Sequence, residues 1–187
     1  PCGCSSGAAM TSRIADGLSE VRHAARDELR LGANQIKAMV SGGVASPHDP
    51  IWNIQYSSEE LKAIVEEAHH WNTYVMAHAY SPEAIRHALN CGVRTIEHAN
   101  LIDAETARLA VEKEAYIVPT LITYFAMEKN GKEPGLPPVS LEKLKEVLEF
   151  GIKSLEICKS SGVKMGFGTD LLGPLHYPVS YTHPEPT

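Results

Sequence analysis

The chain has 187 residues, of which 43% are hydrophobic and 21% charged, and its formal net charge at pH 7 is −6. This composition is typical of an ordinary globular domain with a sizeable core, and it excludes a disordered or fibrous chain. There is no basic excess, so we expect no nucleic-acid partner. No apolar run approaches the roughly 20 residues needed to cross a bilayer, so we also expect no membrane span.

The cysteines and the start of the chain give limited information. Four cysteines in a chain of this length do not indicate a disulfide framework, and we interpret them as ordinary thiols (Cys2, Cys4, Cys91 and Cys158). The sequence begins without Met and without a secretory leader pattern, so we expect it to be a piece of a longer chain. Its place in the cell stays open with the cytoplasm slightly favoured, and a homo-oligomer is compatible with its composition.

The first predicted elements are a helix and a strand. Apolar residues recur at helical spacing between Ser19, a candidate N-cap, and Gly32, which should end the helix. Residues 35–40 then form a short apolar run of strand length. Lys37 interrupts this run where a buried strand should be apolar, so it needs either a charge partner or a chemical role.

A loop, a second helix and a second strand follow. The loop over 41–56 contains His48, a candidate substrate contact because loops that follow strands often carry function, although a surface position is the simpler interpretation. A capping-box pattern from Ser57 to Glu60 opens the helix. The next apolar run has strand character and leads to His78 near its carboxyl end.

The middle of the chain repeats this alternation. Ser81 is the predicted N-cap of a short helix that Gly92 closes, and the strand after it ends at His98. Asp103 is the predicted N-cap of a helix over 104–114.

The last predicted elements are two strands, a loop and a long helix. A strand over 116–120 precedes a loop up to Val139, which we interpret as a mobile lid because long loops in compact domains are often lids. Ser140 should then cap a helix that ends at Gly162. The strand that follows ends at Asp170.

Alternating strands and helices predict an α/β fold with parallel strands and right-handed connections. An open Rossmann-type sheet is the rival, but no Gly-x-Gly-x-x-Gly follows any predicted strand. His78, His98 and Asp170 stand at or near the carboxyl ends of their strands, where α/β barrels keep their chemistry. This placement favours a (β/α)8 TIM-type barrel, of which about five βα units are present.

Two histidines, an aspartate and a lysine on four strands describe a catalytic Zn²⁺-type site. Each residue alone has a simpler interpretation as a core histidine or a helix cap, but chance explains the joint pattern poorly. Tyr80 could bind a substrate carboxylate or merely pack, with even odds. Strand alternation places Glu97 toward the helices, so we leave it out of the site.

These motifs together resemble the metal-dependent amidohydrolase superfamily, and within it the imidazolonepropionase-like and Xaa-Arg or Xaa-Lys dipeptidase (prolidase-like) branch. The resemblance covers roughly residues 16–173. The segments that carry it are Gly32-Ala-Asn-Gln-Ile-Lys37, Ser41-Gly-Gly, His78-Ala-Tyr-Ser, Ile96-Glu-His98-Ala, Val118-Pro-Thr120 and Gly168-Thr-Asp170.

The resemblance implies a site with two divalent metal ions, by expectation Zn²⁺, and a carbamylated lysine between them. Carried over to this sequence, the metal ligands are Lys37, His78, His98 and Asp170, and Asp170 is also the catalytic proton carrier. By the same resemblance the five expected strands correspond to numbers 4 to 8 of the barrel, and the His-x-His of the family's first strand is absent from this sequence. We expect one partial barrel domain over 1–187, with 1–15 and 174–187 irregular.

The implied activity is hydrolysis of amide bonds in N-acyl amino acids or dipeptides. Two cations roughly 3.5–4 Å apart lower the pKa of a bridging water, and the resulting hydroxide attacks the carbonyl. One alternative is a hydrolase of cyclic amides or heterocycles with the same fold. Another is a non-catalytic scaffold that keeps the barrel. We expect the 187 residues by themselves to be inactive.

Overall fold

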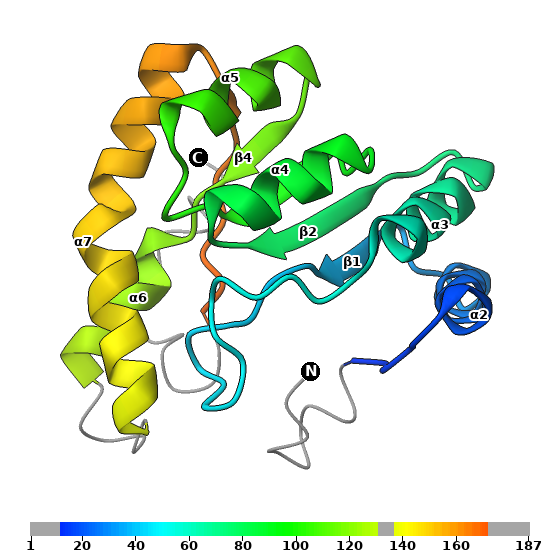
Figure 1. Cartoon of the computed structure of the whole chain (residues 1–187), viewed down its shortest axis with the longest axis horizontal. Helices are drawn as coiled ribbons and strands as arrows, with labels where there is room; N and C mark the ends of the chain where they lie inside the picture. The colour runs from blue at the N-terminus through cyan, green and yellow to red at the C-terminus, as the bar shows by residue number, and fades with distance from the viewer. Residues whose placement is uncertain (1–11, 131–136, 172–187) are drawn as a thin grey trace, which may run out of the picture.

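A computed structural model of the chain describes residues 12–130 and 137–171. In them, five parallel strands form one sheet in the order β1-β2-β3-β4-β5, with the helices following one another around it (Figure 1). The predicted α/β fold with five βα units of a barrel is confirmed. The strands are β1 (Ile36–Met39), β2 (Val75–Ala79), β3 (Thr95–His98), β4 (Tyr116–Val118) and β5 (Lys164–Met165). The helices are α2 (Leu18–Arg30), α3 (Ser58–His70), α4 (Pro82–Asn90), α5 (Ala104–Glu112), α6 (Leu121–Asn130) and α7 (Pro138–Ser161).

The strand register separates the two faces of the sheet. Residues opposite each other in parallel strands point to the same side, and alternate residues point to opposite sides. One row across the sheet, on the face away from the main core, consists of Lys37, Met76, Thr95, Tyr116 and Lys164. We call this face the inner face, because it would line the interior of a closed barrel.

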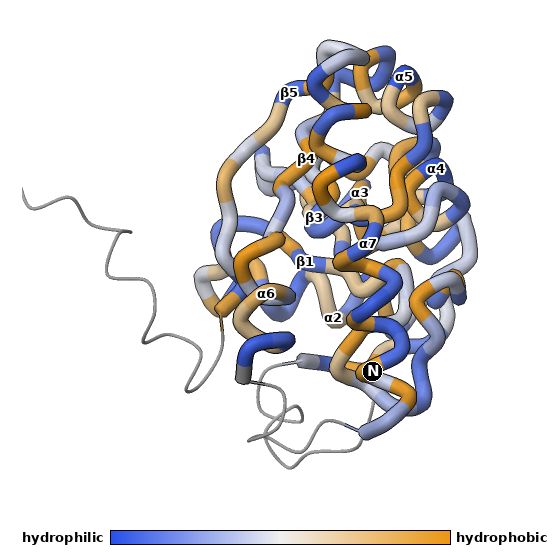
Figure 2. The backbone as a smooth tube through the Cα atoms, turned by 90° about the vertical axis from the view of Figure 1, so that its left-hand side faces the viewer, coloured by the Kyte–Doolittle hydropathy of each residue, from blue (hydrophilic) through white to orange (hydrophobic). Residues whose placement is uncertain are grey.

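The main core lies on the other face, between the strands and helices α2 to α5. Val75, Ala77, Ile96 and Ile117 are each at most 1% exposed there. Full burial of one Val or Ile side chain contributes about 1.5–3 kcal/mol, so this layer dominates the stability of the sheet. Along the helices, hydrophobic and hydrophilic residues alternate, as expected for elements with one buried face (Figure 2).

Most helix starts agree with the sequence predictions, and two do not. Ser57 with Glu60 forms the predicted capping box, and Ser81 and Asp103 each accept a hydrogen bond from the backbone of their helix. Ser19 lies inside α2, so its predicted cap is wrong. Gly17 is the N-cap of α2, and its backbone N–H donates to the Glu60 side chain at 2.7 Å, so that one carboxylate serves two helices.

The start of α7 also differs from prediction. The helix begins at Pro138, because proline fits the first turn, where a missing N–H costs nothing. Ser140 is therefore buried within the helix and caps nothing, while Gly162 ends the helix in a left-handed conformation as predicted. None of the described helices is long and apolar enough to cross a membrane.

The predicted lid is the largest correction. Its first half is helix α6, and Tyr124, assigned to the lid, is only 1% exposed. The second half includes 131–136, which lie outside the described residues, as do most of the predicted irregular ends. The predicted strand ending at Asp170 is also shorter, because only Lys164–Met165 pair with β4 before the chain continues as irregular structure.

Candidate active site

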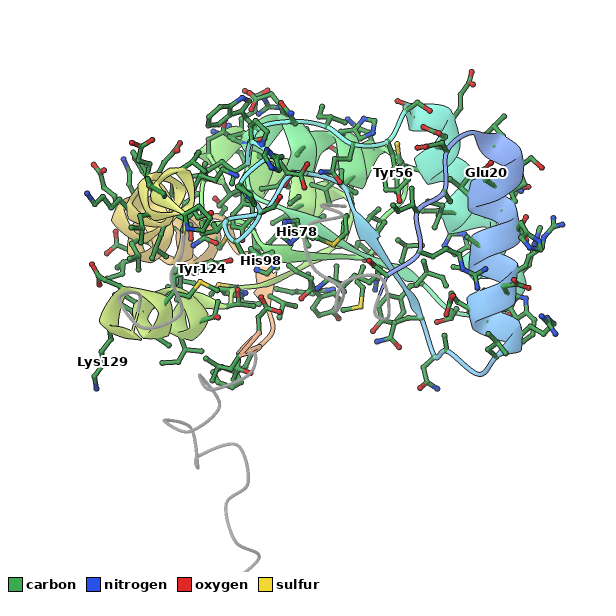
Figure 3. All side chains as sticks on the ribbon, turned by 90° about the horizontal axis from the view of Figure 1, so that it is seen from below. Glu20, Tyr56, His78, His98, Tyr124 and Lys129 are labelled. Atoms are coloured by element: carbon green, nitrogen blue, oxygen red, sulfur yellow. The ribbon has the colours of Figure 1, made fainter. Side chains whose placement is uncertain are left out.

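The site is built around two imidazoles at the carboxyl ends of neighbouring strands (Figure 3). His78 on β2 and His98 at the end of β3 are 6% and 2% exposed, and their ring centroids lie 4.5 Å apart at an interplanar angle of 75°. The ring of Tyr80 stacks on His98 with a centroid distance of 5.1 Å and an angle of 12°. The structure thus brings together three aromatic side chains at the carboxyl ends of β2 and β3.

The backbone of His98 explains how its ring reaches this place. In the register His98 stands opposite Ala79, whose side chain faces the helices. His98 and Ala99, however, have φ angles of 77° and 51°. Two successive left-handed residues cost of order 1–3 kcal/mol each, and they turn the imidazole from the helix side toward His78.

The strand register corrects the expectation for Glu97. Its register partners are His78 and Val118, so its side chain lies on the inner face. It is 5% exposed and accepts a hydrogen bond from Thr95 Oγ1 at 2.8 Å. Burial raises the pKa of the Glu97 carboxyl, while Thr95 and the Lys37 ammonium lower it. Glu97 therefore belongs to the same electrostatic environment as the predicted site residues.

One nitrogen of His98 is held by hydroxyl groups. Its Nδ1 lies 2.7 Å from Thr120 Oγ1 and 2.9 Å from the Tyr124 hydroxyl, which in turn lies 2.7 Å from the Tyr80 hydroxyl. An Nδ1–H that donates to this group leaves a lone pair on Nε2, which makes no hydrogen bond to any described residue. We call Tyr80, Thr120 and Tyr124 the hydroxyl cluster.

His78 is held through its other nitrogen. The Nε2 atom lies 3.1 Å from the carbonyl oxygen of Gly42, an acceptor only, so Nε2–H donates to it. This hydrogen bond leaves the lone pair on Nδ1, for which the described part of the chain offers no partner. Each imidazole thus has one nitrogen that is anchored and one that is free.

Both imidazoles are neutral at pH 7. Burial lowers the pKa of His78 to about 4, against the opposing effect of the Gly42 carbonyl. Burial, followed by the neighbouring His78 and Lys37, holds the pKa of His98 well below its usual range. A neutral imidazole with a free lone pair is the form that binds metal ions.

Lys37 and Asp170 complete the predicted set. Lys37 is exposed on the inner face of β1, and Asp170, exposed beyond β5, has a φ of 49°. Although the residue as a whole is exposed, partial desolvation of its carboxyl group raises the pKa of Asp170, and the Lys37 ammonium opposes this rise. Lys37 therefore acts electrostatically on both histidines and on both acids.

Two further expectations concern substrate contacts. Tyr80 is 3% exposed, and its hydroxyl is bound to Tyr124. His48 is exposed in the loop after β1 and makes no ring contact within the described residues. Of the two, only Tyr80 adjoins the paired histidines.

The donor chemistry fits part of a metal centre. No group of three or more His, Cys, Asp or Glu in residues 12–130 and 137–171 is arranged to hold a metal ion. The free nitrogens of His78 and His98 nevertheless supply two neutral donors, and a carboxylated Lys37 would add an anionic oxygen. The residues present are therefore suitable for part, but not all, of a ligand set.

A cavity of about 590 Å³ lies along β1, on the side where the described residues provide no paired strand. Its lining combines α2 and β1 with the inner-face residues Lys37 and Met39. Space for further polypeptide or ligand therefore adjoins the predicted lysine.

Four residues around the histidines were missed or misplaced by sequence reasoning: Gly42, Glu97, Thr120 and Tyr124. Thr120 carries a usable signal, because it ends the predicted strand over 116–120 as His98 ends its own strand. Tyr124 carries none, since α6 shows no clear separation of apolar and polar faces in the sequence.

Residues 2–178 match the sequence pattern described as the Amidohydrolase family. The chain belongs to this family. A curated relative, ochratoxinase of Aspergillus niger, is 38% identical over 158 residues, which make up 84% of this chain and 32% of the relative. The chain thus spans about a third of the length of that relative.

Solved structures agree with the family assignment. A prolidase complexed with N-methylphosphonate-L-proline is 57% identical with a TM-score of 0.86, over 88% of this chain and 40% of that one. A Xaa-Pro dipeptidase with bound methionine in the active site is 32% identical with a TM-score of 0.76, over 84% and 39% of the two chains. The expected amidohydrolase family and prolidase-like branch are confirmed.

Proposed function

We propose that the protein carrying this chain is a metal-dependent hydrolase of amide bonds that acts on dipeptides or N-acyl amino acids with a free carboxylate. The observation that supports it is the pair His78 and His98, two neutral imidazoles with centroids 4.5 Å apart, each with one anchored and one free nitrogen. Similarity to a prolidase and a Xaa-Pro dipeptidase supports the class of substrate.

The ligands that this chain would contribute are His78 Nδ1, His98 Nε2, a carbamylated Lys37 and Asp170. Lysine as an ammonium cannot bind a cation, but after carboxylation it offers two anionic oxygens that two ions can share. When bound, the divalent ions, by expectation Zn²⁺, would supply the Lewis acidity that ionises a water and polarises the scissile carbonyl.

Proton transfer falls to Asp170 in this proposal. Its carboxylate would accept the proton of the attacking water and deliver it to the leaving nitrogen. Because burial raises the pKa of this carboxyl and Lys37 counteracts the rise, its affinity for a proton depends on the charge state of Lys37. Tyr80, and His48 from the loop after β1, are the candidate contacts for the substrate carboxylate.

The test is a substrate panel with the purified metal-loaded protein: dipeptides including Xaa-Pro, N-acyl amino acids and hydantoin-like rings. We expect turnover of the first two groups that a chelator abolishes and added Zn²⁺ restores. His78→Asn and His98→Asn should each lose metal and activity, whereas His69→Asn, which alters an exposed histidine of α3, should not. Turnover of ring amides alone would favour the cyclic-amide alternative, and a metal-free inactive protein would favour the scaffold.

A further inference from the structure

Lys143 is a lysine in an unusual place. It lies on α7, yet the residue is only 5% exposed. Its ammonium donates to three backbone carbonyls of the segment after β1: Gly43 O at 3.1 Å, Ser46 O at 2.7 Å and Asp49 O at 2.6 Å. An ammonium has three N–H donors, so all of them are used on a segment about a hundred positions earlier in the chain.

The three acceptors belong to one compact loop, residues 42–50. Its two ends touch, because a Cβ on Gly42 would come within 2.5 Å of Asp49 O and 2.3 Å of Pro50 O. Lys143 binds near both ends and in the middle, and Ser140, one turn earlier on α7, donates to Ala45 O at 3.4 Å. Among the described residues no carboxylate forms an ion pair with this ammonium, so the strength of the anchoring depends on the backbone shape of the loop.

The loop in turn contacts the histidine site. Gly42 O accepts the hydrogen bond from His78 Nε2, and Ser41 Oγ accepts from the Tyr80 backbone N–H at 3.3 Å. Val44 packs with Tyr80, Tyr124 and residues of α7 in a second, smaller core. A shift of the loop would therefore move the Gly42 carbonyl and alter its hydrogen bond with His78 Nε2.

We propose that Lys143 is a positioning residue of the active site, whose ammonium keeps loop 42–50 in the shape that presents the Gly42 carbonyl to His78 Nε2. The hydrogen bond fixes the His78 tautomer, so Lys143 determines which ring nitrogen is free. Of the measurements below, only that of metal affinity rests on the proposed function, whereas the tautomer of the His78 ring can be measured without it.

The decisive comparison is Lys143→Met with Lys145→Met in the protein carrying this chain. Methionine keeps the length of the stem and removes the charge and all three donors. Lys145, two positions away on the same helix, is exposed and its ammonium has no hydrogen-bond partner among the described residues, so its substitution controls for loss of a lysine from α7. The three measurements are the ¹⁵N chemical shifts of the His78 ring, the metal affinity by competition with a chromogenic chelator, and the melting temperature.

In Lys143→Met we expect the His78 ring to become a mixture of tautomers and the metal affinity to fall about 10–100-fold, the usual effect of losing a group that orients a ligand. The Lys145→Met protein should match the wild type. A lower melting temperature with the His78 shifts and metal affinity of the control would overturn the inference, because Lys143 would then only stabilise the fold.

A second variant covers the case in which Lys143→Met does not fold. Gly42→Ala pushes the carbonyls of Asp49 and Pro50 away without touching α7, so it should disturb the His78 ring in the same direction. Unchanged His78 shifts in folded Gly42→Ala would refute the link between loop and histidine. A wild-type protein without metal would contradict the proposed function, while the ring shifts would still decide the role of Lys143.

Discussion

Replacing Tyr124 by Phe isolates the contribution of the hydroxyl cluster to the histidine site. The substitution keeps the ring, which is 1% exposed, and removes one oxygen that lies 2.7 Å from the Tyr80 hydroxyl and 2.9 Å from His98 Nδ1. His98 keeps its 2.7 Å contact with Thr120 Oγ1, so the ring loses one of two anchors. Leaving a buried polar group without its hydrogen-bond partner costs about 1–3 kcal/mol of stability. We therefore expect Tyr124→Phe to lower the free energy of unfolding by about 2 kcal/mol.

The same change should affect metal binding, because His98 Nδ1 fixes the orientation of Nε2. We expect about a tenfold weaker metal affinity, the low end of the usual range since Thr120 remains. Chemical denaturation reports the stability, and competition with a chelator reports the affinity. Tyr116→Phe is the control, as this tyrosine is 36% exposed and its hydroxyl has no hydrogen-bond partner in the described residues. If both variants behaved alike in both assays, the hydroxyl cluster would have no role in positioning His98.

Two other predictions concern folding at low pH and the proposed lysine. Hydrogen bonds from Arg26 and Arg22 of α2 hold the pKa of Glu67 of α3 at about 2 instead of 4.5. The ion pairs of Glu67 should therefore stabilise the fold fully above pH 4.5, and this stabilisation should weaken as the pH falls toward 2. Glu67→Gln should lower the free energy of unfolding by about 2 kcal/mol at neutral pH, and urea titrations should show a weaker dependence of this free energy on pH. If the variant lost stability in acid as the wild type does, the ion pairs of Glu67 would not be responsible for the dependence. Lys37→Ala should abolish metal binding and activity, with partial recovery on adding short carboxylic acids; a Lys37→Ala protein that binds two metals would contradict the proposed carbamate.

Local chemistry explains which elements could be predicted from the sequence. The capping box at Ser57 and the caps at Ser81 and Asp103 act through hydrogen bonds to amides within three residues, so the sequence alone contains both partners. The cap of α2 could not be found this way, because Gly17 uses Glu60, which is 43 positions away. A glycine cap with a distant partner leaves no local pattern.

Helices α6 and α7 show how tertiary packing can hide a buried face. The buried residues of α7 recur at helical spacing, but most are small or polar: Ser140, Lys143, Leu144, Val147, Gly151, Ser154 and Cys158. Leu141 and Ile152 are instead 37% and 58% exposed. Hydrophobic periodicity therefore indicates the buried face of α7 only in part. Gly151 lies where α7 crosses α6, and a Cβ there would come within 2.7 Å of Leu121 Cδ2, so the Leu121 side chain would have to move.

The candidate site combines a predictable and an unpredictable part. His78 follows simple strand alternation, since its side chain stays on the inner face of β2. His98 does not, because a φ of 77° turns a residue from the helix-facing row into the site and leaves Glu97 on the inner face. Alternation alone would place only one of these two neighbours beside His78, and the left-handed turn places both there. The strained backbone thus adds the imidazole of His98 to the side of the sheet that already carries His78 and Glu97, whereas a regular strand end would have directed it into the helices.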